Sequence, residues 1–192
     1  WYGMMIGRIA TPTFILTSGL VVGYLYRSRR TDWSRLRIHL SDKAIFLGTV
    51  GHLIIALFDT ARVGSLSKAV FAGYITDTIA FCVLFGVIVV PRTTPLLRLT
   101  LAGALYAMVW IAWSYWHPTG PSWTLVKDVF IGPQGGPQGE DAIVFWFPLL
   151  PWASLYLAGS CLGEYVGSQN AKELHTSLAV SLIKIAAGTL AL

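Results

Sequence analysis

Charged residues are scarce in this sequence. They make up 12% of its 192 residues, whereas 55% are hydrophobic, and the mean hydropathy is +0.63. An ordinary soluble domain carries about 25% charged residues and lacks repeated apolar runs long enough to cross a bilayer. The shortage of charge therefore excludes that class and predicts a protein embedded in a membrane. The net charge of +5 has to be interpreted by where the basic residues lie relative to the spans, and it does not indicate nucleic-acid binding.

Cysteine and the common catalytic motifs are also nearly absent. The two cysteines, Cys82 and Cys161, both lie in apolar runs, where a small packing role is more typical than a disulfide or a metal ligand. The sequence contains no CxxC, HExxH, GxSxG or P-loop pattern. Hydrolases, zinc enzymes and nucleotide-binding enzymes built on these motifs are therefore excluded, and we predict no metal site.

The apolar runs predict an all-α polytopic transmembrane helix bundle that forms a single domain. Helices are expected because only they satisfy their own backbone groups in lipid without closing a barrel, and the runs lack the alternation of barrel strands. We predict six spans, near residues 4–26, 44–59, 69–90, 96–116, 142–166 and 174–192.

The basic residues predict how the spans are oriented. Nine of them lie after or at the ends of the first, third and fifth spans, most of them in the predicted loop 27–43, and three lie on the other side. The positive-inside rule then places the Arg-rich loop 27–43 in the cytoplasm and the loop 117–141 outside. Residues 123–132 in the outer loop are apolar enough to lie on the membrane surface or to fold back over a cavity, although a flexible connection is the simpler interpretation. The aromatic residues expected at the outer interface are Trp110, Trp113, Tyr115, Trp116 and Trp123.

Among the ionisable residues inside predicted spans we single out four, namely Arg8, His52, Asp77 and Lys184. Such residues are energetically costly in lipid and usually face protein or water. Arg8 either extends to the outer interface or joins a buried polar site, and Lys184 lies near a helix end if its span is shifted. His52 is either a hydrogen-bonded link between helices or a general base, because histidine titrates near neutral pH. Asp77 is expected to pair with Arg8, His52 or Lys184.

Small residues and prolines predict how two spans pack and start. Gly19 and Gly23 form one GxxxG pattern, and Gly159 and Gly163 form another, each of which allows a close helix–helix approach. Pro148 and Pro151, in the stretch FPLLPW (147–152), fit the first turn of a helix, where a missing N–H has no partner to lose. We therefore expect the fifth span to start there and to hold one face against another helix.

The stretch FPLLPWASLYLAGSCLGEYV (147–166) resembles a segment of the membrane-embedded acyltransferases related to heparan-α-glucosaminide N-acetyltransferase and their bacterial relatives. RIATPTFILTSGLVVGYLYRSRR (8–30) is similar to an early span of that family, and ITDTIAFCVLFGVIVVP (75–91) is similar more loosely to a later one. The matching positions of the early span are Arg8, Pro12, Phe14, Ser18 and Gly19.

The resemblance implies transfer of an acyl group from cytoplasmic acyl-CoA, as donor substrate, to a sugar-type acceptor across a bacterial inner membrane. Arg8, His52 and Asp77 are the candidate catalytic residues, and Arg29 and Arg30 are the candidates for holding the CoA phosphates, unless the basic loop only sets topology. The family also uses a histidine after an Asp-x-x-Arg-Gly type motif. This sequence lacks that motif, which would precede Trp1, and we expect the chain to be part of a longer protein.

A second hypothesis is a non-catalytic, acyltransferase-like membrane subunit. In that case the protein would contact the lipid bilayer and pack against other membrane subunits through its GxxxG faces. A small transporter is a weaker alternative, because no paired, interrupted half-repeats are present.

Overall fold

The computed structural model describes residues 2–133 and 147–168, with side chains except for residues 2–10, 62 and 63. Every regular element in these residues is helical. The α-helices are α1 (Tyr2–Ser28), α2 (Trp33–Phe46), α3 (His52–Val63), α4 (Leu66–Phe71), α5 (Ile75–Val89), α6 (Pro95–Tyr115), α7 (Pro121–Phe130) and α8 (Leu149–Ser168). Short turns of other helix types are η1 (Arg30–Asp32), the π-helical η2 (Leu47–Gly51) and η3 (Val90–Arg92). The predicted all-α bundle is therefore confirmed for the described residues.

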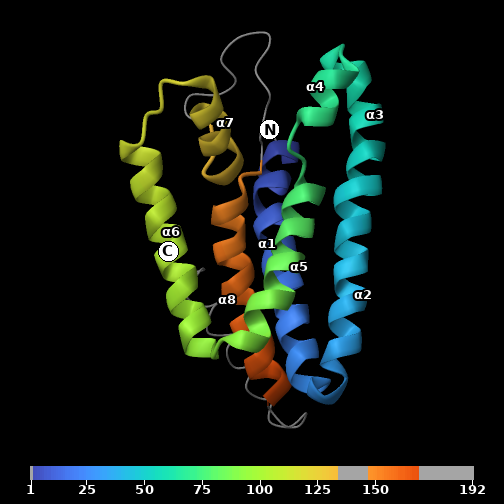
Figure 1. The fold of residues 1–192 in the computed structure, drawn as a ribbon, viewed down its shortest axis with the longest axis vertical. Coiled ribbons are helices and arrows are strands. Elements are labelled where there is room, and N and C mark those ends of the chain that lie inside the picture. The colour runs from blue at the N-terminus through green and yellow to red at the C-terminus, as the bar shows by residue number, and fades with distance from the viewer. Residues whose placement is uncertain (1, 134–146, 169–192) are drawn as a thin grey trace.

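The long helices run side by side along one axis (Figure 1). α1 and α8 form the central pair, and α5 packs on both of them. α2, η2 and α3 follow one another as a single long rod that lies against α5, whereas α6 packs against α8. The short helices α4 and α7 cap the bundle at the end opposite the connection between α1 and α2 (Figure 1).

The two GxxxG patterns face each other. A methyl group added at Gly19 or Gly23 would overlap the main-chain carbonyl of Tyr156 or Ser160 in α8. Additions at Gly159 and Gly163 would overlap carbonyls of α1 in the same way. The expected packing of α8 on another helix is confirmed, and that helix is α1. Because both glycine faces are occupied within one chain, they no longer point to partner subunits.

Local signals explain several helix ends. α8 begins directly after Pro148 and holds Pro151 in its first turn, as FPLLPW predicts. α6 has Pro95 at its first position, and the Thr94 hydroxyl accepts a hydrogen bond from the Leu97 N–H at 3.3 Å. α3 ends at Gly64, whose φ of 73° is a left-handed conformation that favours glycine.

Two boundaries differ from the prediction. Much of the predicted loop 27–43 is helical, because α2 starts at Trp33 and the rod Arg30–Ala61 is 32 residues long. Residues 31–47 contain no Gly or Pro and several strong helix formers, so nothing interrupts the helix before the apolar run. The predicted span 69–90 is also divided, since α4 ends at Phe71 and α5 starts only at Ile75.

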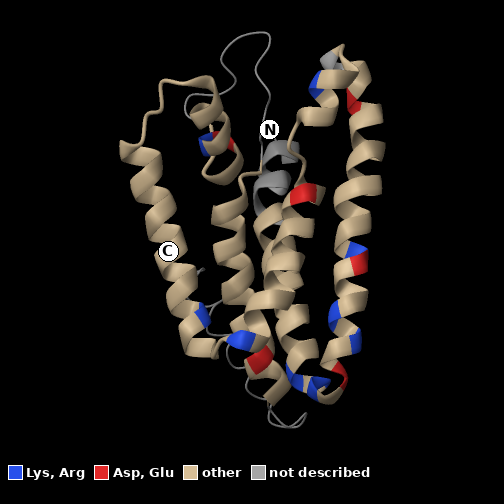
Figure 2. Ribbon diagram, viewed as in Figure 1, with Lys and Arg blue, Asp and Glu red and all other residues tan. Residues whose placement is uncertain are grey.

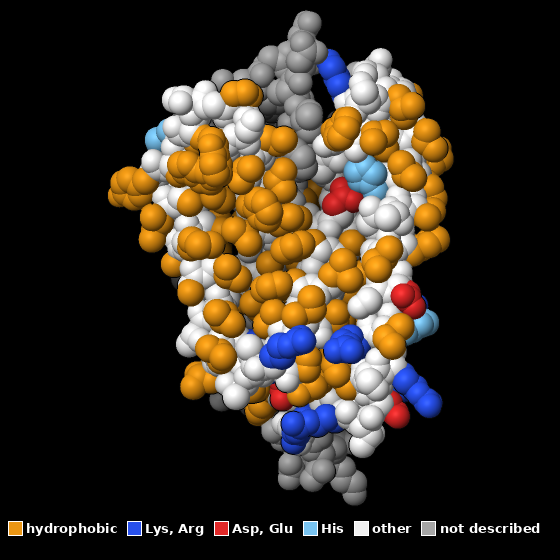
Figure 3. All heavy atoms as spheres, viewed as in Figure 1, with side chains coloured by type: hydrophobic (Ala, Val, Ile, Leu, Met, Phe, Trp, Pro, Cys, Tyr) orange, Lys and Arg blue, Asp and Glu red, His pale blue; other side chains and the backbone are white. Residues whose placement is uncertain are grey.

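Three helices are long and apolar enough to cross a membrane, among the residues described. They are Arg30–Ala61, Ile75–Arg92 and Pro95–Tyr115. Large apolar side chains also cover the outside of the bundle, with Phe58 80% and Leu96 73% exposed (Figure 3). These features are consistent with an integral membrane protein. Six spans are not confirmed, and the predicted span 174–192, with Lys184, lies outside the described residues.

Charge is unevenly distributed along the bundle axis. Figure 2 shows most Lys and Arg residues gathered toward the lower end, where α1 turns into α2 and α5 into α6. We call this the Arg-rich end; it includes Arg27, Arg29, Arg30, Arg35, Arg37, Arg92 and Arg98. The segregation that the positive-inside argument relies on is therefore present in the folded chain.

Candidate functional site

His52 and Asp77, two of the ionisable residues predicted to lie in spans, are hydrogen-bonded to each other. The His52 Nδ1 atom lies 2.8 Å from the Asp77 Oδ1 atom. His52 is the first residue of α3, and Asp77 lies in the first turn of α5. Their side chains are 17% and 27% exposed, so the pair is half-buried at a surface rather than sealed in the core.

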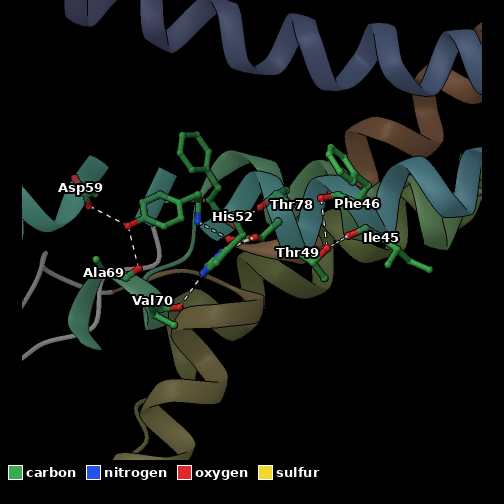
Figure 4. A network of polar contacts seen from close by, with 11 residues as sticks. Ile45, Phe46, Thr49, His52, Asp59, Ala69, Val70 and Thr78 are labelled. Atoms are coloured by element: carbon green, nitrogen blue, oxygen red, sulfur yellow. Dashed lines mark hydrogen bonds and ion pairs between the residues drawn. The ribbon is translucent and has the colours of Figure 1, made fainter. Parts of the chain in front are cut away.

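Further hydrogen bonds hold both members of the His52–Asp77 pair. The His52 Nε2 atom lies 2.8 Å from the main-chain oxygen of Val70 in α4. The Tyr74 N–H donates to the Asp77 Oδ2 atom at 2.8 Å, which caps the start of α5. The Tyr74 hydroxyl is 3.1 Å from the Asp59 carboxylate and 3.0 Å from the main-chain oxygen of Ala69. This network links α3, α4 and α5 (Figure 4).

The π-helical turn η2 directly precedes His52 and contributes to its position. Gly48 in this turn lets the rod approach α5 closely, since an added methyl would lie only 3.1 Å from the Ala80 methyl. The Thr49 hydroxyl donates to the Ile45 carbonyl at 2.7 Å within the rod (Figure 4). Single π-helical turns inside α-helices are frequent at functional sites.

The His52–Asp77 pair borders a cavity of about 340 Å³. Most of its wall is apolar and comes from α4, α7 and the residues at the start of α8, including Val70, Phe71, Val129, Phe147 and Leu149. The Thr78 hydroxyl also lines it but donates to the main-chain oxygen of Phe147 at 2.6 Å. In Figure 3 an acidic side chain and a histidine side chain adjoin on the viewed face among apolar neighbours.

The other predicted site residues are not brought to this cavity. Arg29 and Arg30 belong to the Arg-rich end, and the Arg30 guanidinium lies 5.9 Å from the ring centre of Tyr26. Arg8 lies on α1, but its side chain is outside the described residues, so its role stays a prediction. The proposed donor-binding and catalytic residues therefore lie toward opposite ends of the bundle (Figures 1 and 2).

A buried ion pair joins α6 to α8 and was not predicted. The Arg98 side chain is fully buried, bonds to the Glu164 carboxylate and donates to the Ser160 hydroxyl at 3.2 Å. The sequence places one basic residue, Arg98, in one apolar run and one acidic residue, Glu164, in another, and charges inside such runs are usually paired. The pairing itself spans 66 residues of sequence and could not be read from either run.

A second unpredicted polar contact lies in the segment after α6, which the sequence predicts to be an outer loop. Residues 121–130 form the helix α7, and its Lys127 is buried with its Nζ atom bonded to the main-chain oxygen of Trp116. Burial lowers the pKa of Lys127, and the neighbouring Asp128 partly opposes that shift. The aromatic residues expected at this interface lie at the end of α6 and on α7, where Trp116 and Trp123 pack edge to face.

No metal-binding cluster of three or more His, Cys, Asp and Glu side chains occurs among the described residues. Cys82 and Cys161 are both free thiols, and Cys82 is buried in the core as a small packing residue. Comparisons with known proteins find no matching family model, no matching curated protein and no matching solved structure.

Proposed function

We propose that this protein is a membrane-embedded acyltransferase that moves an acyl group from acyl-CoA to a small sugar-type acceptor. The cavity beside His52 and Asp77 is the acceptor site, and the Arg-rich end receives the donor. The proposed location is a bacterial inner membrane, with the Arg-rich end in the cytoplasm and the cavity toward the outside.

The observation that carries this proposal is the hydrogen-bonded His52–Asp77 pair at the edge of an otherwise apolar cavity. Ionisable groups at membrane depth are retained mainly where they serve a site. Acyl transfer from a thioester needs a group that takes the proton of the acceptor as the new bond forms. A histidine–carboxylate pair beside a cavity supplies such a group.

The arginines lie toward the end of the bundle opposite the cavity, which fits a reaction whose donor and acceptor are on opposite sides of the membrane. Arg29 and Arg30 are exposed at the Arg-rich end, where their guanidinium groups are suited to the phosphates of CoA. The acyl group would have to pass along the bundle to reach the cavity. In the overall reaction the acceptor O–H bond and the donor C–S bond break, a C–O bond forms, and CoA leaves as a thiol, with one proton lost by the acceptor and one gained by the thiol.

The test is transfer of a labelled acyl group from acetyl-CoA to a small neutral sugar, such as glucose or N-acetylglucosamine, by the purified protein in nanodiscs. The proposal expects labelled product, and Asp77→Asn should lower its rate about 100-fold. His39→Ala is the matched control, because His39 is exposed on α2 away from the cavity. Absence of product with every acceptor, or an Asp77→Asn variant as fast as the native protein, would argue against acyl transfer at this site.

The proposed donor site has its own test. Arg29→Gln with Arg30→Gln should raise the KM for acyl-CoA and leave the kcat nearly unchanged, since these residues contribute to binding alone. Lys43→Gln, which changes an exposed lysine further along α2 and outside the Arg-rich end, is the control. An unchanged KM would assign the basic cluster to topology only.

A second candidate, a non-catalytic membrane subunit, is favoured by one observation. Both ring nitrogens of His52 are bonded to protein groups, as in a histidine that only links helices. This candidate expects no turnover from the purified protein, while His52→Ala lowers its melting temperature. Turnover that depends on Asp77 would exclude it.

A further inference from the structure

The protons around His52 can be counted from its partners. The Val70 main-chain oxygen is an acceptor only, and it lies 2.8 Å from the His52 Nε2 atom. The Nε2 atom must therefore carry hydrogen and donate. It has no lone pair with which to accept a proton from a substrate.

The other ring nitrogen is used as well. Between the His52 Nδ1 atom and the Asp77 Oδ1 atom, 2.8 Å apart, there is room for one proton. If the proton is on nitrogen, His52 is an imidazolium and Asp77 a carboxylate; if it is on oxygen, both groups are neutral. In neither form does the imidazole offer a free lone pair to the cavity, so His52 cannot be the general base in this arrangement.

The carboxylate of Asp77 does retain free acceptor positions. An ionised carboxyl group has about four lone-pair sites. One is used by His52 Nδ1 and one by the Tyr74 N–H. Asp77 is also the more exposed member of the pair and lines the cavity. Two hydroxyl-bearing residues described in the wall are already engaged: the Thr78 hydroxyl donates to the Phe147 carbonyl, and the Tyr74 hydroxyl bonds to Asp59 and to the Ala69 carbonyl.

We propose that Asp77 is the catalytic residue that accepts the proton of the acceptor, and that His52 is a positioning residue held as an imidazolium between Val70 and Asp77. This assignment rests on the proposed acyl transfer. His52 and Tyr74 each donate an N–H to one oxygen of the Asp77 carboxylate and so fix its orientation at the edge of the cavity. The first proton transfer then leaves the electron pair on the acceptor oxygen, which bonds to the acyl carbon, while Asp77 becomes a carboxylic acid. As the C–O bond forms the donor C–S bond breaks, the thiolate of CoA takes up a proton from water, and Asp77 returns its proton to water.

The cavity also limits the acceptor. Its volume of about 340 Å³ lies at the small end of the range for small-molecule sites. Its wall is mainly apolar, and the imidazolium and carboxylate together carry no net charge. The acceptor is therefore a small neutral molecule that donates an O–H to Asp77 and places an apolar face against Val129, Phe147 or Leu149. A large or strongly charged acceptor does not fit this description.

The protonation of His52 can be measured without any turnover. Nitrogen-15 NMR of the protein in nanodiscs, with histidine labelled and the His52 signals assigned by their loss in His52→Gln, reports which ring nitrogens carry hydrogen. The expected result near neutral pH is an imidazolium with both nitrogens protonated. In Asp77→Asn, which removes the carboxylate, His52 should become neutral. A native His52 that is neutral in either tautomer would overturn the assignment, because Asp77 would then carry a proton already or His52 would have a free lone pair.

Kinetics provide the second readout. Asp77→Asn should lower kcat about 100-fold. His52→Asn should lower kcat only about 10-fold, because its amide can still donate a hydrogen bond to Asp77. The reverse order would identify His52 as the base and overturn the proposal. If the NMR shows an imidazolium but no acceptor is acylated, the proposed function fails while the role of His52 as a donor to Asp77 stands.

Discussion

Gly23 of α1 packs directly on the main-chain carbonyl of Ser160 in α8, with no room for a side chain between them. The same kind of contact recurs one turn earlier between Gly19 and Tyr156. Backbone-to-backbone packing of this kind allows extensive van der Waals contact in lipid, where water does not drive helices together. The central helix pair therefore depends on small residues at fixed positions.

Replacing Gly23 by alanine should lower the stability of the bundle. The added methyl overlaps a carbonyl oxygen of α8, so the helices must separate, and overpacking of this kind typically costs about 1–3 kcal/mol. Thermal unfolding in detergent, followed by circular dichroism, measures the effect. Gly103→Ala in α6 is the matched control, because a methyl there meets nothing within 4 Å. Equal melting temperatures for the two variants would show that the α1–α8 contact is not tight.

Removing one partner of the Arg98–Glu164 pair should be more damaging than removing both. Arg98→Met leaves the Glu164 carboxylate without its cation in a largely buried place, and breaking a buried pair costs about 3–5 kcal/mol. Arg98→Met with Glu164→Leu should recover much of that loss, since no unpaired charge remains. A double-mutant cycle of unfolding free energies measures the coupling. Additive effects would mean that the two charges do not interact.

The free energy of unfolding should increase as the pH rises toward 10.5, the ordinary pKa of Lys127. Burial lowers the pKa of Lys127 in the folded state, so the folded protein binds fewer protons than the unfolded chain between the lowered value and 10.5. Asp128 acts in the opposite sense at acidic pH, because burial raises its pKa and favours the protonated folded form. The melting temperature of the native protein should therefore rise with pH across the alkaline range, and Lys127→Met should abolish this rise. Lys43→Met, which changes an exposed lysine, is the control and should retain it. A rise that persists in Lys127→Met would assign it to another group.

Much of the architecture could be predicted because it depends on local patterns. The lengths of the apolar runs predicted helices, Pro148 and Pro151 predicted the start of α8, and the two GxxxG patterns predicted a close helix–helix contact. The predicted loop 27–43 was wrong over most of its length, because charge was taken as a sign of a loop although arginine and leucine favour helices. A helix of 32 residues is about 48 Å long, so it can cross a 30 Å core and still extend into water.

The candidate site was only partly predictable, since pairing depends on tertiary packing. His52 and Asp77 were identified as isolated ionisable residues, but three partners were possible for Asp77. The choice of His52 depends on how η2 approaches α5. The bond from His52 to the Val70 carbonyl had no signal in the sequence at all, because any residue can supply a main-chain oxygen.

The most direct test of the central claim uses sealed proteoliposomes with the acceptor inside and labelled acyl-CoA outside, for protein inserted with its Arg-rich end outward. The account predicts that label accumulates on the enclosed acceptor and that Asp77→Asn lowers this rate about 100-fold while His39→Ala does not. Labelling that requires donor and acceptor on the same side, or that proceeds at the native rate in Asp77→Asn, would contradict it.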